Sequence, residues 1–162
     1  MKLYLKGQVM VEALVAMTII VVGLLGIFTL LSRSLNLNRV VANQYIGANL
    51  AAEGMELFKN LIDRNVMQGL PFNSGACLTI GDHSLDYNDT HASGCGYKDS
   101  FLLFDQNGHY GYDQGEPTTF RRTITISQPD PDEIRVTSRV TWVNRGDEQF
   151  EISLEDHFFN WR

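Results

Sequence analysis

Hydrophobic and polar positions divide this 162-residue chain into three successive patterns. In the first, from Ala13 to Leu31, 19 consecutive residues carry no charged side chain, and most are Leu, Ile, Val, Ala, Met or Phe. A helix of that length rises about 30 Å, which is the thickness of the hydrocarbon core of a bilayer. This pattern predicts a membrane-spanning helix near the N-terminus of the chain.

In the second pattern the hydrophobic residues are confined to one helical face. They recur every three or four residues, the spacing of an amphipathic helix: Leu37, Val41, Tyr45, Ala48, Ala52, Met55, Phe58 and Ile62. Gln68-Gly69-Leu70-Pro71 is a helix stop signal. We therefore expect one helix from about Val9 to about Asn65, with residues 8–35 as its hydrophobic half and residues 36–65 as its amphipathic half. Four glycines are expected weak points, each costing about 1 kcal/mol of helix stability relative to alanine: Gly23, Gly26, Gly47 and Gly54.

The following region, residues 66–100, is rich in Gly, Asn, Asp and Ser, which indicates loops and turns. Both cysteines of the chain, Cys77 and Cys95, fall in it with 17 residues between them. An even cysteine count is compatible with one disulfide in an exported domain, and such a bridge would stabilise the fold by about 3 kcal/mol. Two buried thiols are the alternative. Two cysteines are too few for a structural zinc site, which normally has four N or S ligands.

The third pattern, in residues 101–162, consists of short segments rich in β-branched and aromatic residues and separated by turn residues. The expected strands are Phe101–Phe104, His109–Tyr112, Thr118–Ile126, Ile134–Val143 and a last one from Phe150 to Phe158. Breaks are expected at Pro129-Asp130-Pro131-Asp132 and at Asn144-Arg145-Gly146-Asp147. Because the connections are short, an antiparallel meander is favoured.

Together these elements predict an α+β fold, in which a long N-terminal helix packs on a C-terminal antiparallel sheet of about four strands. The inward face of the Ile134–Val143 strand should carry Ile134, Val136, Val140 and Trp142. The helix residues expected to face the sheet are Tyr45, Ala52, Met55, Phe58 and Ile62.

Charge and motif content exclude several classes of function. A net charge of −6 and a pI of about 5.1 argue against a general nucleic-acid binder, which needs a basic face. No nucleotide-binding glycine loop, zinc-ligand spacing or nucleophile elbow occurs, so we expect no enzyme, no catalytic residue and no cofactor. The histidines are scattered: His83, His91, His109 and His157. A group of aspartates does not have EF-hand spacing and is expected to be solvated rather than to hold calcium: Asp82, Asp86, Asp89, Asp99 and Asp105.

A short basic segment with Lys2 and Lys6 precedes the apolar run. The run is longer than the ~7–15 apolar residues of a secretory signal, and no small-x-small cleavage motif follows Leu31, so we expect the helix to stay in the mature protein. Arg33 and Arg39 lie on its other side, so the positive-inside rule does not decide the orientation. The short N-terminal tail favours an inside N-terminus and an exported C-terminal domain.

Glu12 is the one carboxylate at the start of the apolar run. A carboxylate in or near hydrocarbon costs a few kcal/mol, so such a residue normally has a role and a partner. The alternative is that Glu12 lies at the level of the lipid headgroups. Cutting the chain after Gly7 would expose an amine on Gln8 and make Glu12 the fifth residue. In a bundle of parallel helices that amine could pair with Glu12 of a neighbouring subunit and fix the axial stagger.

The segment Lys6-Gly7-Gln8-Val9-Met10-Val11-Glu12-Ala13-Leu14-Val15-Ala16-Met17 resembles the processing site of type IV prepilins and type II secretion pseudopilins. Such proteins have a short basic leader that ends in glycine, a glutamate fifth after the cut and an apolar helix. Glu12–Met17 with Val22–Gly26 is most similar to minor pilins of the PilV type and to pseudopilin I. The resemblance is strong from residue 1 to about 35 and weak to about Arg64. The family usually has phenylalanine or methionine where this chain has Gln8, so N-methylation of Gln8 stays open.

The resemblance implies a pilin-like fold and a structural role without catalysis. Residues 1–7 would be a leader removed by a prepilin peptidase between Gly7 and Gln8, and Glu12 would act in filament assembly. The chain would be a minor pilin or pseudopilin of a type IV pilus or a related secretion or uptake filament. Its partners would be the peptidase, other pilin or pseudopilin subunits and an inner-membrane assembly platform. It would be a single-pass protein of the cytoplasmic membrane before it enters an extracellular or periplasmic filament. The alternative is a bitopic anchor that holds an extracellular binding module and is never assembled.

Overall fold

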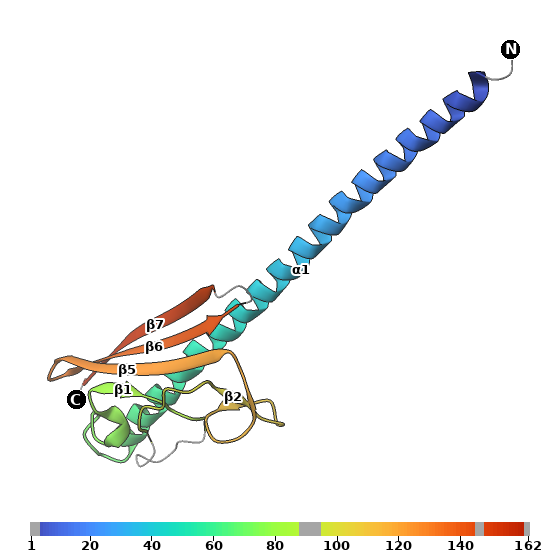
Figure 1. Ribbon diagram of the computed structural model, residues 1–162. Helices are drawn as coiled ribbons and strands as arrows, with labels where there is room; N and C mark the ends of the chain where they lie inside the picture. Colours follow the sequence, from blue (N-terminus) through green and yellow to red (C-terminus); the bar gives the residue numbers. More distant parts are fainter. Residues whose placement is uncertain (1–3, 88–94, 145–147, 161–162) are drawn as a thin grey trace. The chain divides into compact units, whose positions relative to one another are not determined.

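The computed structural model describes residues 4–87, 95–144 and 148–160. One long helix, α1 (Tyr4–Met67), precedes a short 3-10 helix and seven strands (Figure 1). The later elements are η1 (Ala76–Leu78), β1 (Gly81–His83), β2 (Leu103–Phe104), β3 (Tyr110–Gly111), β4 (Glu116–Pro117), β5 (Phe120–Asp130), β6 (Glu133–Val143) and β7 (Gln149–Phe159). The chain divides into two compact units, Met1–Ala42 and Asn43–Arg162, and α1 contributes residues to both.

The first unit consists of the apolar half of α1. Its large hydrophobic side chains from Val9 to Leu37 are between 52% and 72% exposed, and they lie on every side of the helix. The hydroxyl groups of Thr18 and Thr29 donate hydrogen bonds back to the carbonyls of Val15 and Leu25, both at 2.8 Å. Polar groups satisfied within the helix in this way are suited to an apolar surrounding. By length and composition α1 is a candidate membrane span, as the sequence predicts.

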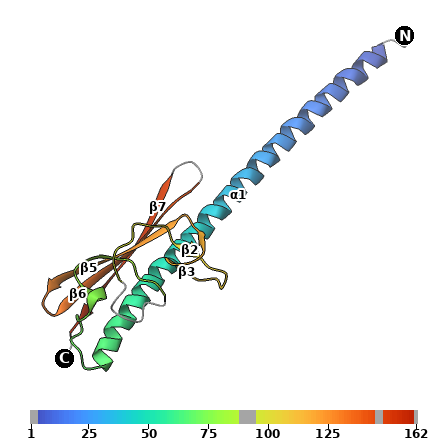
Figure 2. The same cartoon turned by 60° about the horizontal axis from the view of Figure 1, so that its bottom comes forward.

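In the second unit, the remainder of α1 packs on an antiparallel sheet of four strands in the order β1-β5-β6-β7 (Figure 1 and Figure 2). The strands β5 and β6 form the centre, with Ile126 opposite Val136 and Phe120 opposite Trp142. The register shifts between Ser127 and Asp130, next to Pro129, which has no N–H to give to the ladder. The predicted α+β fold is therefore confirmed.

The sheet differs from the prediction in its membership. β1 lies within residues 66–100, which were expected to be loops, and it pairs with β5 along Gly81–His83. The predicted strands Phe101–Phe104 and His109–Tyr112 instead contribute to a second sheet in the order β3-β2-β4. The sequence Gly-Asp-His has little intrinsic preference for a strand, so its extended form depends on pairing with the long edge of β5. The expected turns at Asn144–Asp147 and around residues 88–94 lie largely outside the described residues.

The inward face of β6 is as predicted, because Ile134, Val136, Val140 and Trp142 are all buried. The face of the helix that was predicted to pack on the sheet was wrong in part. Tyr45 is 71% exposed and Ala52 is exposed too, although both were expected to face the sheet. The helix residues that are buried instead follow a rotated stripe: Gly47, Leu50, Ala51, Gly54, Phe58, Leu61, Ile62 and Asn65.

Two glycines explain this rotation. A Cβ atom on Gly47 would lie 2.6 Å from Cζ3 of Trp142, and one on Gly54 would lie 2.5 Å from Oγ of Ser138. The helix thus approaches β6 closely where it has no side chains. The sequence prediction chose the buried face from apolar side chains and so left out the two glycines. The predicted face is therefore rotated around the helix axis relative to the face that is buried. Gly47 and Gly54 are contact positions, and not only weak points in the helix.

Candidate functional site

The residues of the sequence-derived site, Gly7, Gln8 and Glu12, lie on α1 and are exposed. Gln8 and Glu12 are four residues apart and so lie on one face of the helix, one turn from each other. Together with Gly7 and Val11 they form an open, nearly flat surface of the helix. A Cβ atom on Gly7 would meet no heavy atom within 4 Å. This site is therefore an exposed helix surface, with room for a partner to approach it.

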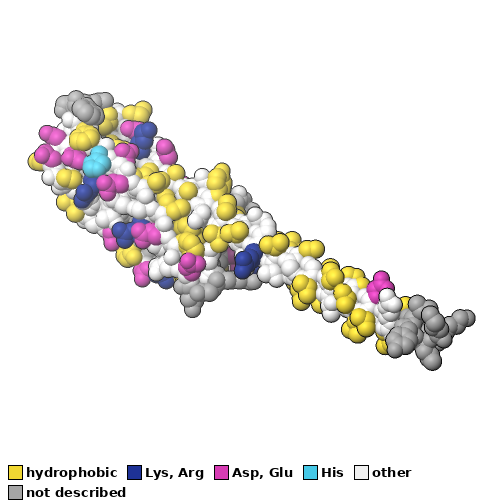
Figure 3. All heavy atoms as spheres, turned by 90° about the horizontal axis from the view of Figure 1, so that it is seen from above, with side chains coloured by type: hydrophobic (Ala, Val, Ile, Leu, Met, Phe, Trp, Pro, Cys, Tyr) yellow, Lys and Arg dark blue, Asp and Glu magenta, His cyan; other side chains and the backbone are white. Residues whose placement is uncertain are grey.

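Glu12 is the only acidic residue from Gly7 to Ala52. Figure 3 shows acidic atoms among hydrophobic side chains on the described part of the N-terminal half of α1. Within the described residues no cation forms an ion pair with it. The structure thus places Gln8 and Glu12 on one face of the helix, and no described side chain forms an ion pair with the Glu12 carboxylate.

Arg122 is a buried charge that the sequence interpretation missed. It stands on the inward face of β5, and its guanidinium donates hydrogen bonds to the carbonyls of Leu50 at 3.3 Å and Leu85 at 2.7 Å. It also forms an ion pair with Glu53 at 3.3 Å. The Tyr112 hydroxyl donates to the Arg122 carbonyl at 2.9 Å, and burial raises the pKa of Tyr112, so its hydroxyl stays a donor at neutral pH. Arg122 therefore connects α1, β5 and the segment after β1. The only feature of the sequence that could have pointed to this role was an arginine among the apolar inward positions of β5.

The two cysteines form the predicted disulfide. Cys77 and Cys95 are bonded, with 5.0 Å between their Cα atoms, and both are buried. His83 lies beside this bond, with Nδ1 2.8 Å from the Cys95 carbonyl oxygen and Nε2 2.7 Å from that of Thr79. These contacts hold β1 and the ends of the disulfide loop together. His83 therefore has a structural role, in which its two ring nitrogens contact the carbonyl oxygens of Thr79 and Cys95.

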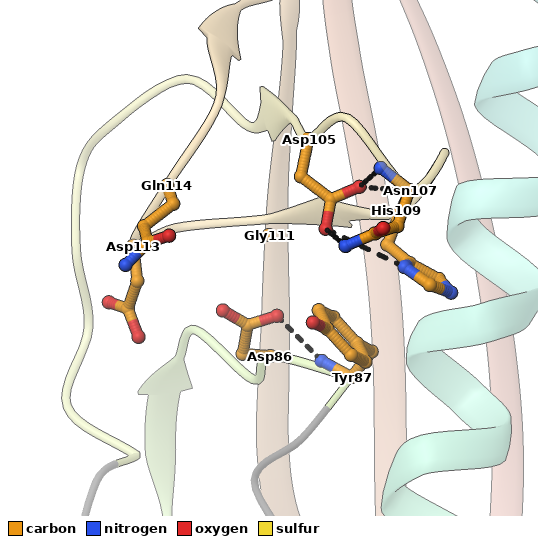
Figure 4. Close-up of a pocket in the computed structure, with 8 residues that line it drawn as sticks. All are labelled: Asp86, Tyr87, Asp105, Asn107, His109, Gly111, Asp113 and Gln114. Carbon is orange, nitrogen blue, oxygen red and sulfur yellow. Dashed lines mark hydrogen bonds and ion pairs between the residues drawn. The ribbon is translucent and has the colours of Figure 1, made fainter.

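A polar hollow of about 270 Å³ lies beside the second sheet (Figure 4). The Asp86 carboxylate accepts hydrogen bonds from the backbone N–H groups of Tyr87 at 2.7 Å and Tyr112 at 3.1 Å. Asp105 accepts from the N–H groups of Asn107 and His109, both at 2.8 Å, and the bond from His109 lowers the pKa of Asp105. These carboxylates shape the loops around them.

The described residues contain no group of three or more His, Cys, Asp or Glu side chains placed to hold a metal ion. Asp89 and His91, two of the residues considered from the sequence, lie outside the described residues. The other histidines have separate surroundings: His83 is next to the disulfide, His109 stacks on the Tyr87 ring at 4.8 Å, and His157 lies on β7. The structure therefore does not assemble them into one site.

Comparison of the chain with protein-family models, with curated proteins and with solved structures finds no match.

Proposed function

We propose that this chain is a structural subunit of a type IV pilus or of a related secretion or uptake filament, as a minor pilin or a pseudopilin. A prepilin peptidase cuts it between Gly7 and Gln8, and an inner-membrane platform assembles it with other subunits. It begins as a single-pass protein of the cytoplasmic membrane with an exported C-terminal domain. Then it enters an extracellular or periplasmic filament.

The exposed apolar side chains of the first unit support this proposal. The large hydrophobic side chains from Val9 to Leu37 are more than half exposed all round the helix. Each such side chain gains about 1.5–3 kcal/mol when it is fully removed from water. A helix of this kind needs lipid or other helices on every side. A membrane supplies that environment first, and a bundle of parallel subunits supplies it afterwards.

Glu12 is the observation that carries the proposal. An anchor that only spans the membrane has no use for a carboxylate within an apolar helix surface, because it costs a few kcal/mol there. An amine created on Gln8 by cleavage after Gly7 is a suitable partner on a neighbouring helix. Two groups that are costly alone then form a charge-assisted pair. Four-residue spacing along one face of α1 places Gln8 one turn from Glu12, so a small axial shift between subunits aligns the amine with the carboxylate.

The alternative is a bitopic anchor for an extracellular binding module. Intact-mass measurement of the exported full chain separates the two. The filament proposal predicts loss of residues 1–7, and Gly7→Leu should block that loss. A retained leader in the wild-type chain would contradict the proposal and favour the anchor.

The role of Glu12 is tested by Glu12→Leu. This change should leave membrane insertion intact, because it makes the helix more apolar, and should reduce incorporation into filaments at least about tenfold, which corresponds to a loss of about 1.4 kcal/mol. Thr18→Val is the matched control, because it also replaces a polar side chain of the apolar helix but leaves Glu12 in place. Quantitative immunoblotting of membrane and sheared filament fractions measures both. Normal incorporation of Glu12→Leu would remove the role proposed for the carboxylate.

A further inference from the structure

The strand β7 forms an edge of the main sheet. All its residues, Gln149–Phe159, pair with β6, and the register is continuous. No strand of the described chain pairs with its other side. The opposite edge of the sheet is β1, which is only three residues long. β7 is thus the one long strand edge that this sheet leaves open within the described residues, as the views in Figure 1 and Figure 2 also show.

The ends of the β6–β7 ladder reveal which backbone groups point outward. The Asn144 N–H donates to the Glu148 carbonyl at 3.1 Å, and the Asn160 N–H donates to the Asp132 carbonyl at 2.9 Å. In an antiparallel pair the residues that bond to the partner alternate with those that do not. Even-numbered residues of β7 therefore bond to β6. Odd-numbered residues direct their N–H and C=O groups away from the sheet: Gln149, Glu151, Ser153 and Glu155.

Part of the usual protection of an edge strand is missing from residues 149–155 of β7, whose only charged side chains are Glu151 and Glu155. Native edges are commonly blocked by proline, by charged side chains and above all lysine, by a bulge or by a charge pointing inward. Residues 149–155 contain no proline or lysine, and their pairing with β6 shows no bulge. Protection begins only at the C-terminal end, where the Asp156 carboxylate accepts the outward N–H of His157 at 2.8 Å. The outward backbone groups before that point are open to another strand.

The two faces beside this edge have opposite character. On the face away from α1, Glu151 and Glu155 are exposed. Glu151 forms an ion pair with Arg139 of β6 at 3.6 Å, Glu155 lies 3.4 Å from Nε2 of His157, and β7 itself carries no Lys or Arg. On the face toward α1, Leu154 is 38% exposed, and Met55 of the helix is only partly buried. A strand added here would place alternate side chains against an apolar surface and against carboxylates.

We propose that the open edge of β7 binds an extended polypeptide segment in which apolar and basic side chains alternate, as a fifth strand of the sheet. β6 already meets β7 in this manner. Its apolar side chains point to the core, while its Arg139 lies 3.6 Å from Glu151 on the other face. The proposed segment would make the same two kinds of contact, apolar and basic, at the open edge of β7. This site does not depend on cleavage at Gly7 or on filament assembly.

A second copy of β7 is a poorer occupant. Antiparallel self-pairing centred on Ser153 would set Glu151 of each copy opposite Glu155 of the other. Like charges directly opposite one another destabilise a strand pair. Basic side chains in the added segment remove this repulsion, and main-chain hydrogen bonds to the outward groups of β7 supply the binding energy.

The test uses the full chain in detergent micelles and a fluorescently labelled peptide with the sequence of Ile134–Trp142 as the probe. Ser153→Pro removes an outward N–H and no ladder hydrogen bond, whereas Ser153→Ala keeps the backbone intact. Fluorescence anisotropy should show binding to the wild type and to Ser153→Ala, and affinity reduced at least about tenfold for Ser153→Pro. Equal affinity of the two variants would overturn the proposal.

Two further measurements keep the test decisive if Ser153→Pro perturbs the fold. On the wild-type chain, amide hydrogen exchange should slow on peptide binding at Glu151 and Ser153, and absence of that protection would refute the site. A peptide with both arginines replaced by glutamate should bind the wild type at least about fivefold more weakly, and Glu155→Lys should reverse the preference. Concentration-dependent dimerisation of the chain that Ser153→Pro abolishes would instead identify a second copy as the occupant.

Discussion

The two halves of α1 belong to one helix, but they differ in how apolar side chains are distributed around it and therefore suit different surroundings. Residues 13–31 present apolar side chains in all directions, and none of the large hydrophobic ones from Val9 to Leu37 is buried. Residues 43–67 bury a single stripe against the sheet and expose mainly polar residues elsewhere. A helix that is apolar all round requires an environment that its own chain does not provide. The amphipathic half finds that environment within the chain, and so it defines the folded domain.

Glycine shows the same contrast within one residue type. Cβ atoms on Gly23 and Gly26 would meet nothing within 4 Å, whereas those on Gly47 and Gly54 would collide with side chains of β6. In the first half, glycine leaves open space beside the helix. In the second half it creates the close contact that positions the sheet. The difference follows from the presence of a packed partner, and mutations can separate the two cases.

The largest effect is expected from removing the buried charge of the second half. Arg122→Ala removes the side-chain donors to the carbonyls of Leu50 and Leu85, leaves Glu53 without its ion-pair partner and opens a cavity, so the free energy of unfolding should fall by about 3–5 kcal/mol. Denaturant unfolding followed by tryptophan fluorescence measures this. Arg39→Ala, an exposed arginine of the first half, should change the same quantity by less than about 0.5 kcal/mol. Similar values for both variants would contradict the proposed role of Arg122.

A smaller effect is expected from a methyl group at the closest approach of helix and sheet. Gly47→Ala raises helix propensity by about 1 kcal/mol. It also forces the buried Trp142 ring to move, because the new Cβ would lie 2.6 Å from the ring. Overpacking of this kind costs about 1–3 kcal/mol, so we expect a net loss of about 1 kcal/mol in unfolding free energy. The same measurement should find Gly23→Ala neutral or stabilising by up to about 1 kcal/mol, because its Cβ would meet nothing within 4 Å. Stabilisation by Gly47→Ala would show that the helix can shift away from β6.

Much of the fold could be predicted from sequence because local pattern and tertiary packing agree there. The alternation in β6 predicted its inward face, and the stop signal Gln68-Gly69-Leu70-Pro71 predicted the end of α1, which lies at Met67. Where tertiary contacts decide, the sequence was insufficient. β1 is extended because β5 is available to pair with it, and the buried stripe of α1 depends on Gly47 and Gly54.

For the candidate functional site, one part could be predicted from the sequence and the other parts required the structure. The spacing of Gly7 and Glu12 is visible in the sequence, and the structure adds that Gln8 and Glu12 share a face and that Glu12 has no ion-pair partner within the described residues. The role of Arg122 could not be predicted from the sequence, because its hydrogen-bond acceptors are carbonyl groups of residues that are distant along the chain. The open edge of β7 likewise depends on strand order, which the pattern of alternation does not fix.

The smallest effect concerns an exposed charge on β7, which contrasts with the buried Arg122. A hydrogen bond to the Glu133 carboxylate at 2.5 Å, supported by Glu155 at 3.4 Å, raises the pKa of His157 above 6.5. Because the raised pKa belongs to the folded state, this contribution to stability is fully present below pH 6.5 and is lost as pH rises through the folded pKa. Exposed ion pairs contribute little, so the change in stability should be small. NMR titration of the His157 ring should give a pKa above 6.5 in the wild type and a lower value in Glu133→Gln, where the acceptor is neutral. An unchanged value in Glu133→Gln would mean that this carboxylate does not control the ring.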